Sequence, residues 1–284
     1  MKRITGHKGD IFKPKGQLKR EIDLAERHAE RVVEILGDFV SEERAQFFDR
    51  VIQSRIRKLT VAVDGVTDPH NTAAVIRTAE AFGMQTVHIV ENGTPFQSSR
   101  RVTRGTHKWI DFAVWKTPSQ FADAVKGEGK RILTAEAGAA VPLDELDPNI
   151  PTALVFGNEK DGISEEMRAL SDGNFYIPMD GFAESLNVSV AAAVSIHSLC
   201  RRISGDLSPR EQSVLKARYY LLSVRAGYDI AVQAIGGAVA HVQVESSIPT
   251  AHLEVYVALR PGRVLVAAWT MLEQQLLLSG RGLQ

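Results

Sequence analysis

The sequence contains a single cysteine, Cys200, among 284 residues. One thiol forms no internal disulfide, and no cluster of Cys, His, Asp or Glu has metal-ligand spacing, so we expect a reducing compartment and no bound metal. The N-terminus lacks the apolar run of a signal peptide, and no apolar stretch reaches the roughly 18 residues needed to cross a bilayer. These absences predict a cytoplasmic protein that does not contact a membrane.

A net charge is absent too, since 34 basic residues balance 34 acidic ones. No overall field indicates a partner, so only local clusters of charge are informative. Three common motifs are also missing: the GxxxxGK[ST] phosphate loop, a GxGxxG after the first strand, and the GxSxG of serine hydrolases. Ordinary nucleotide, dinucleotide and serine-hydrolase sites therefore have no support in the sequence.

Strand and helix patterns alternate through the middle of the chain. "LTVAVDGV" (59–66) is typical of a buried strand, "NTAAVIRTAEAF" (71–82) of a short helix with Asn71 as its cap, and "TVHIVE" (86–91) of a second strand. Further strands are expected at 111–115, 131–136, 152–157 and 174–179, and further helices at 117–126, 164–171, 185–203 and 208–224. This alternation predicts an α/β fold with a parallel sheet and helices on both faces.

Three polar loops follow predicted strands: "DGVTDPHN", "FGNEKDGIS" and "IPMDGFAESLN". Open parallel sheets bind ligands at the carboxyl ends of their strands, so the loops together predict one pocket. Each loop alone has a simpler interpretation. Arg77 would end in solvent or on Glu80, "EKDG" would be a solvated turn, and "ESLN" would be a helix entry capped by Ser185 or Asn187.

Taken together, these loops resemble the three motifs of the SpoU/TrmH-type branch of the SPOUT RNA methyltransferases. "DGVTDPHNTAAVIRTAEAFG", "ALVFGNEKDGIS" and "YIPMDGFAESLNVSVAAAVSIH" stand in the family's order, and the resemblance covers about residues 40–225. "RGTHKWIDF" and "EQSVLKARYYLLSV" are similar to the tRNA guanosine-18 2′-O-methyltransferase subgroup. The resemblance implies a deep C-terminal trefoil knot, S-adenosylmethionine as cofactor, and a homodimer.

The same resemblance assigns roles to individual residues. It implies that Arg77 holds a phosphate and favours the ionised ribose hydroxyl, and that Asn71 orients Arg77; whether the phosphate or Arg77 takes the proton stays open. The implied catalytic set is Asn71, Arg77, Glu159, Ser185 and Asn187, and the implied cofactor pocket is Thr134, Gly157, Ile177 and Leu186.

The resemblance and the local charge also predict an organisation of the chain. A basic stretch before the third strand, without an intervening acid, is expected to contact RNA, although a solvated helix face is an alternative. It comprises Arg100, Arg101, Arg104, His107 and Lys108. The predicted parts are a basic flexible arm (1–20), an N-terminal helical extension (21–57), the SPOUT methyltransferase domain (58–205), a C-terminal helix (206–229) and an extension of unknown role (230–284).

The predicted function is an S-adenosylmethionine-dependent RNA ribose 2′-O-methyltransferase, acting on guanosine 18 in the tRNA D-loop. Methylation of a ribosomal RNA nucleotide and a non-catalytic RNA-binding role on the same fold are the alternatives. The chain lacks room for the separate N-terminal RNA-binding domain of ribosomal RNA relatives, which favours tRNA. Residues 230–284, with only six charged side chains, depart from the family pattern.

Overall fold

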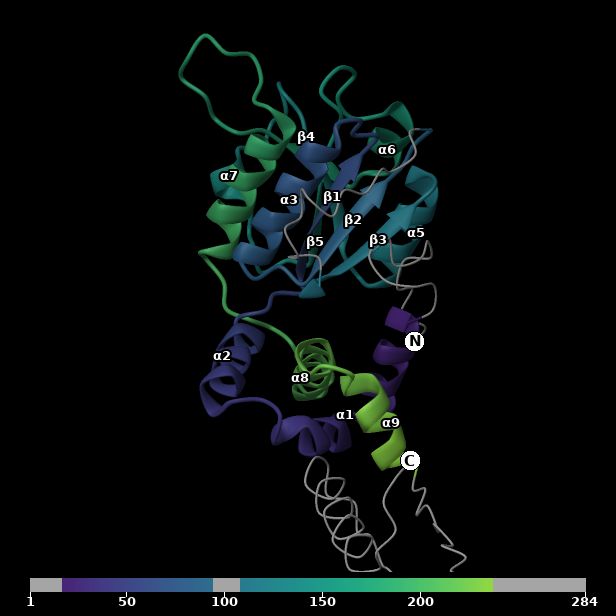
Figure 1. Ribbon diagram of the computed structural model, residues 1–284. Helices are drawn as coiled ribbons and strands as arrows, with labels where there is room; N and C mark the ends of the chain where they lie inside the picture. Colours follow the sequence, from purple (N-terminus) through teal and green to yellow (C-terminus); the bar gives the residue numbers. More distant parts are fainter. Residues whose placement is uncertain (1–16, 94–107, 237–284) are drawn as a thin grey trace, which may run out of the picture.

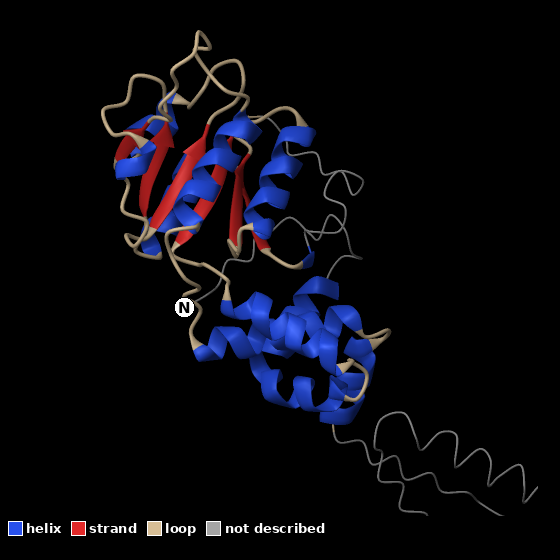
Figure 2. Cartoon of the chain, turned by 90° about the vertical axis from the view of Figure 1, so that its left-hand side faces the viewer, coloured by secondary structure: helices blue, strands red, loops and turns tan. Residues whose placement is uncertain are grey.

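The computed structural model describes residues 17–93 and 108–236, which form a six-stranded parallel sheet covered by helices and, beside it, an all-helical bundle (Figures 1 and 2). The strand order is β3-β2-β1-β5-β4-β6, and every neighbouring pair is parallel. The expected α/β fold is therefore confirmed. The strands are β1 (Leu59–Asp64), β2 (Thr86–Val90), β3 (Asp111–Trp115), β4 (Arg131–Ala135), β5 (Thr152–Phe156) and β6 (Gly173–Phe175).

Two helices cover each face of the sheet. Helices α3 (Pro69–Ala81) and α7 (Val188–Cys200) pack side by side on one face, and α5 (Pro118–Gly127) and α6 (Glu165–Leu170) pack on the other (Figure 1). Strand β1 lies at the centre and all six of its residues are buried, as expected for a parallel strand covered on both sides. Cys200 ends α7 inside this core, and burial raises the pKa of its thiol to about 12, so it has a packing role.

The bundle consists of α1 (Gln17–Gly37), α2 (Glu42–Gln53), α8 (Pro209–Ser223) and α9 (Gly227–Ile235), with a separate core that includes Phe48 and Tyr219. Helix α1 begins inside the predicted arm of residues 1–20 and is kinked at His28. Ser208 and Glu211 form a capping box at the start of α8. Helix α9 was not predicted, because its apolar sequence merges with the low-charge segment that follows.

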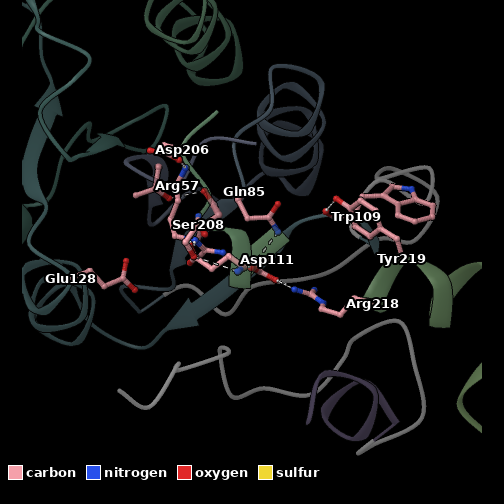
Figure 3. A network of polar contacts seen from close by, with 12 residues as sticks. Arg57, Gln85, Trp109, Asp111, Glu128, Asp206, Ser208, Arg218 and Tyr219 are labelled. Atoms are coloured by element: carbon pink, nitrogen blue, oxygen red, sulfur yellow. Dashed lines mark hydrogen bonds and ion pairs between the residues drawn. The ribbon is translucent and has the colours of Figure 1, made fainter. Parts of the chain in front are cut away.

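Polar contacts join the bundle to the sheet (Figure 3). Arg218 Nη1 of α8 lies 2.7 Å from Asp111 Oδ1 at the start of β3, and the Tyr219 hydroxyl donates to the Trp109 carbonyl at 2.9 Å. Burial alone would raise the pKa of Asp111, but the guanidiniums of Arg218 and Arg57 hold it below its usual value. This joint anchors the chain where it enters β3.

The two chain segments that connect bundle and sheet also touch each other. Asp206 accepts hydrogen bonds from the backbone N–H groups of Arg57 and Lys58. A Cβ at Gly205 would lie 1.9 Å from the carbonyl oxygen of Gln53, so this crossing requires glycine. The bundle is thus held at a defined position relative to the sheet.

Candidate active site

The three predicted motif loops meet at the carboxyl edge of the sheet. The Asn71 side-chain amide donates a hydrogen bond to the Glu159 carboxylate, and its oxygen accepts one from Asn187 Nδ2 at 3.2 Å. These residues lie 88 and 116 positions from Asn71 in the sequence. One side chain from each motif therefore forms a continuous hydrogen-bonded set, as the combined interpretation of the loops predicts.

Asn71 does not cap its helix, contrary to the sequence prediction. Asp68 is the N-cap of α3 and accepts from the His70 N–H at 2.8 Å, with Pro69 in the first turn. A proline favours the first helical position because it has no N–H to satisfy, so the helix starts earlier than expected. Asn71 consequently lies within the first turn, where its amide is available to the other two motifs.

The Asn187 side chain both caps α7 and binds Asn71. It is the N-cap of α7, and its Oδ1 accepts from the backbone N–H of Ser189 at 2.9 Å and from the Ser189 hydroxyl at 2.6 Å. Its Nδ2 is the group that donates to Asn71. Of the two caps considered from the sequence, Ser185 and Asn187, the structure thus selects Asn187.

The loop after β5 is a tight turn that presents Glu159. Asn158 and Gly162 exchange two backbone hydrogen bonds of 3.0 and 3.1 Å, and Asn158 Oδ1 accepts from the backbone N–H of Lys160 at 2.9 Å. A Cβ at Gly157 would lie 2.1 Å from the backbone carbon of Gly162. Only glycine fits at Gly157, which is part of the predicted cofactor pocket.

Asp64, which is not among the residues predicted from the sequence, links the same region through hydrogen bonds. Its side chain is 1% exposed, and its two carboxylate oxygens accept from Asn92 Nδ2 at 3.1 Å and from the Ser164 N–H at 3.0 Å. Asp64 ends β1, Asn92 follows β2, and Ser164 caps α6. In the sequence, the feature that could have indicated this role is an acidic residue at the end of an apolar strand, directly before Gly65.

Comparison with known proteins identifies this arrangement. Residues 58–197 match the model of the SpoU rRNA Methylase family. The tRNA (guanosine(18)-2′-O)-methyltransferase of Escherichia coli K12 is 36% identical over 175 residues, which is 61% of this chain and 76% of the relative. The corresponding protein of Thermus thermophilus is 37% identical over 163 residues, or 57% of this chain and 84% of that one. The chain belongs to the SpoU methylase family.

A solved structure agrees with this assignment. The A. aeolicus TrmH/SpoU tRNA modifying enzyme superposes with a TM-score of 0.57 at 31% identity and covers 65% of this chain and 98% of its own. This SpoU methylase is accordingly an RNA methyltransferase, and its methyl donor is S-adenosylmethionine. The resemblance seen in the three motifs is confirmed.

Two of the four predicted pocket residues of this SpoU methylase lie on neighbouring strands, and the other two lie in the third motif loop. Gly157 and Thr134 belong to the neighbouring strands β5 and β4 or their ends, and the side chains of Ile177 and Leu186 are partly buried. The Thr134 side chain is fully buried and its hydroxyl donates to Glu136 Oε1 at 2.7 Å, so this side chain is not presented to a ligand. Aliphatic side chains and loop backbone are groups that suit an adenine ring and its nitrogen atoms, so these residues fit S-adenosylmethionine.

Other predicted residues are not part of the hydrogen-bonded set. Arg77 is exposed on α3, and Ser185 is exposed in the loop before α7; neither side chain forms a hydrogen bond or ion pair with another residue of the described chain. Asn71 therefore does not orient Arg77 directly, contrary to the sequence prediction. Six residues along a helix correspond to about 240° of rotation, so the two side chains point in different directions.

The predicted RNA-binding stretch is described only at its end. Lys108 is exposed, while Arg100, Arg101, Arg104 and His107 lie outside the described residues. Within the ranges 17–93 and 108–236, no group of three or more His, Cys, Asp or Glu residues is arranged to hold a metal ion. The helices of those ranges include none that is long and apolar enough to span a membrane.

Proposed function

We propose that this SpoU methylase methylates the 2′-hydroxyl of guanosine 18 in the D-loop of tRNA. The observation that supports it most is the contact among Asn71, Glu159 and Asn187, since Asn71 lies on the helix that also carries the exposed Arg77. Relatives named for that reaction are 30–37% identical to this chain. A tRNA substrate implies a cytoplasmic enzyme.

The proposed chemistry assigns different tasks to these residues. S-adenosylmethionine supplies a methyl group on a positively charged sulfur, which is a good leaving group. A ribose hydroxyl is a weak nucleophile and must lose its proton as it attacks. Arg77 has a guanidinium free to hold the adjacent phosphate and to stabilise the developing negative oxygen. The Asn71 set holds the loops in place, and the exposed Ser185 completes the predicted site.

The catalytic unit is proposed to be a trefoil knot. After β6, at one edge of the sheet, the chain runs through residues 176–187 to α7, which packs beside α3 over the central strands β1 and β5. On the way, Tyr176 exchanges backbone hydrogen bonds with Val141 and Leu143 of the preceding β4–β5 connection. These bonds bring the two long connections together, which supports the proposal that one threads past the other in a C-terminal knot.

RNA contact is proposed for the surface next to β3. Arg100, Arg101, Arg104 and Lys108 precede the point where Arg218 and Tyr219 anchor the chain to the bundle. Their positive charge suits the phosphate backbone. We propose residues 58–205 as the methyltransferase domain. The helices of the bundle, α1, α2, α8 and α9, are proposed to support the RNA contact.

The function is tested by incubating the protein with labelled S-adenosylmethionine and separate pools of tRNA and ribosomal RNA. Alkali cleaves RNA through a free 2′-hydroxyl, so a methylated ribose leaves a gap in the hydrolysis ladder. We expect one gap, after nucleotide 18 of tRNA, and none in ribosomal RNA. A tRNA transcript with adenosine at that position is the control and should remain unlabelled. A gap only in ribosomal RNA would instead favour the alternative substrate.

A homodimer is proposed to form through α7. Val190 and Val194, four residues apart on one face of that helix, are 46% and 40% exposed, and Phe182 in the preceding loop is fully exposed. Exposed aliphatic side chains in a row indicate a contact with another protein surface. The Val194→Glu substitution is expected to convert a dimer to a monomer in analytical ultracentrifugation. Val232→Glu, at an equally exposed valine of α9, is the matched control and should leave the dimer intact.

A further inference from the structure

Arg77 has one charged neighbour on its own helix, and the two do not pair. The positions three and four residues away from Arg77 are Ala73, Ala74, Glu80 and Ala81. An acid and a base at this spacing on a helix surface commonly form an ion pair. In the described chain the Arg77 guanidinium nevertheless forms no hydrogen bond or ion pair. The carboxylate of Glu80 instead forms an ion pair with a residue outside α3.

Glu80 is bound by Arg55, which lies in the connection between α2 and β1. Arg55 is 1% exposed, and its Nη2 lies 2.9 Å from Glu80 Oε1. Its Nη1 donates to the backbone carbonyl of Glu80 at 3.4 Å. Glu80 stands in the last turn of α3, where the negative end of the helix makes an acid unfavourable. Arg55 thus compensates both the carboxylate and the helix end.

The competition between the two arginines for Glu80 is unequal. A solvent-exposed ion pair between residues three apart on a helix contributes little to stability, because water screens both charges. The Arg55 guanidinium is almost completely buried, and leaving a buried charge without its partner costs far more than losing an exposed pair. Glu80 therefore stays on Arg55, and the exposed Arg77 has no internal counter-ion on α3.

We propose that Arg55 is a positioning residue for methyl transfer, because it withholds Glu80 from Arg77 and so keeps the Arg77 guanidinium free for the RNA phosphate. This inference rests on the proposed function of Arg77. Without Arg55, the Glu80 carboxylate turns to Arg77, neutralises it and competes with the phosphate. Arg55, in the connection from the bundle to β1, thereby keeps the positive charge of Arg77 available to the RNA.

The test compares three variants of the full chain, each assayed below its melting temperature. Arg55→Met removes the charge at similar length, and its kcat/KM for tRNA is expected to fall about tenfold. Arg55→Lys keeps a cation for Glu80 and should stay within about threefold of the unmodified protein. Adding Glu80→Gln to Arg55→Met removes the competing carboxylate and should restore activity to within about threefold.

A second pair of variants leaves Arg55 in place, in case Arg55→Met does not fold. Ala81 is exposed and lies four residues after Arg77. Ala81→Glu puts an uncommitted carboxylate beside Arg77 and should lower kcat/KM, whereas the equally large Ala81→Gln should not. The inference is overturned if Arg55→Met retains full activity, if Glu80→Gln fails to restore it, or if Ala81→Glu and Ala81→Gln behave alike. Absence of any RNA methylation by the unmodified protein would instead overturn the proposed function.

Discussion

Arg77→Ala is expected to lower kcat for tRNA methylation about a thousandfold while the affinity for S-adenosylmethionine stays nearly unchanged. Removing one donor that stabilises a developing oxyanion costs on the order of 10²–10³ in kcat in other enzymes, and Arg77 is proposed both to stabilise that charge and to hold the phosphate. Arg77 belongs to neither the Asn71 contact set nor the predicted pocket, so cofactor binding should survive. Single-turnover kinetics and a separate cofactor-binding titration measure the two quantities.

Arg77→Lys is the matched control for that variant. A lysine keeps the positive charge but lacks the planar fork that binds phosphate through two parallel hydrogen bonds, so an intermediate rate is expected. The assigned role of Arg77 is wrong if the alanine variant turns over at the rate of the unmodified protein. It is also wrong if the alanine variant loses rate and cofactor affinity in equal measure, since Arg77 would then act on the pocket.

Gly157→Ala is expected to abolish measurable S-adenosylmethionine binding. The added Cβ would lie 2.1 Å from the backbone carbon and 2.2 Å from the carbonyl oxygen of Gly162, and backbone atoms cannot rotate away as a flexible side chain does. The turn that carries Glu159 must open, which separates Glu159 from Asn71. Overpacking of this kind typically costs about 1–3 kcal/mol of folding free energy, so the melting temperature should also fall.

Gly181→Ala provides the comparison. Gly181 lies in the third motif loop, and a Cβ there meets no atom within 4 Å. Calorimetric titration with S-adenosylmethionine and thermal unfolding should therefore give values close to those of the unmodified protein. If Gly157→Ala binds the cofactor as tightly as Gly181→Ala does, the tight turn is not a requirement of the pocket.

Local sequence patterns predicted the sheet because each strand is a short apolar run bounded by turn residues. The run at 111–115 is observed as β3 with those bounds, but β6 ends at Phe175 although the pattern extended to residue 179. Tyr176 leaves the sheet there and pairs with Val141 and Leu143 instead. No pattern within 174–179 contains that information, since it depends on a distant segment.

The motif residues were predicted through resemblance, whereas their contacts were not. Asn71 was expected to cap α3 and orient Arg77, but Asp68 and Pro69 start the helix and leave the Asn71 amide to Glu159 and Asn187. The pairing of Arg55 with Glu80 joins residues 25 positions apart in different elements. Such partners are fixed by how elements pack, and a single sequence specifies packing only indirectly.

Asn187 and the only cysteine of the chain stand at opposite ends of α7, so the thiol can report on the packing of that helix. Cys200 ends the same helix, is 7% exposed, and is the chain's only thiol. Because the thiol is almost fully covered, a thiol-directed reagent is expected to label it slowly while α7 stays packed on the sheet. A faster labelling of Cys200 Sγ would therefore indicate loosening of the helix at whose N-terminus Asn187 binds Asn71.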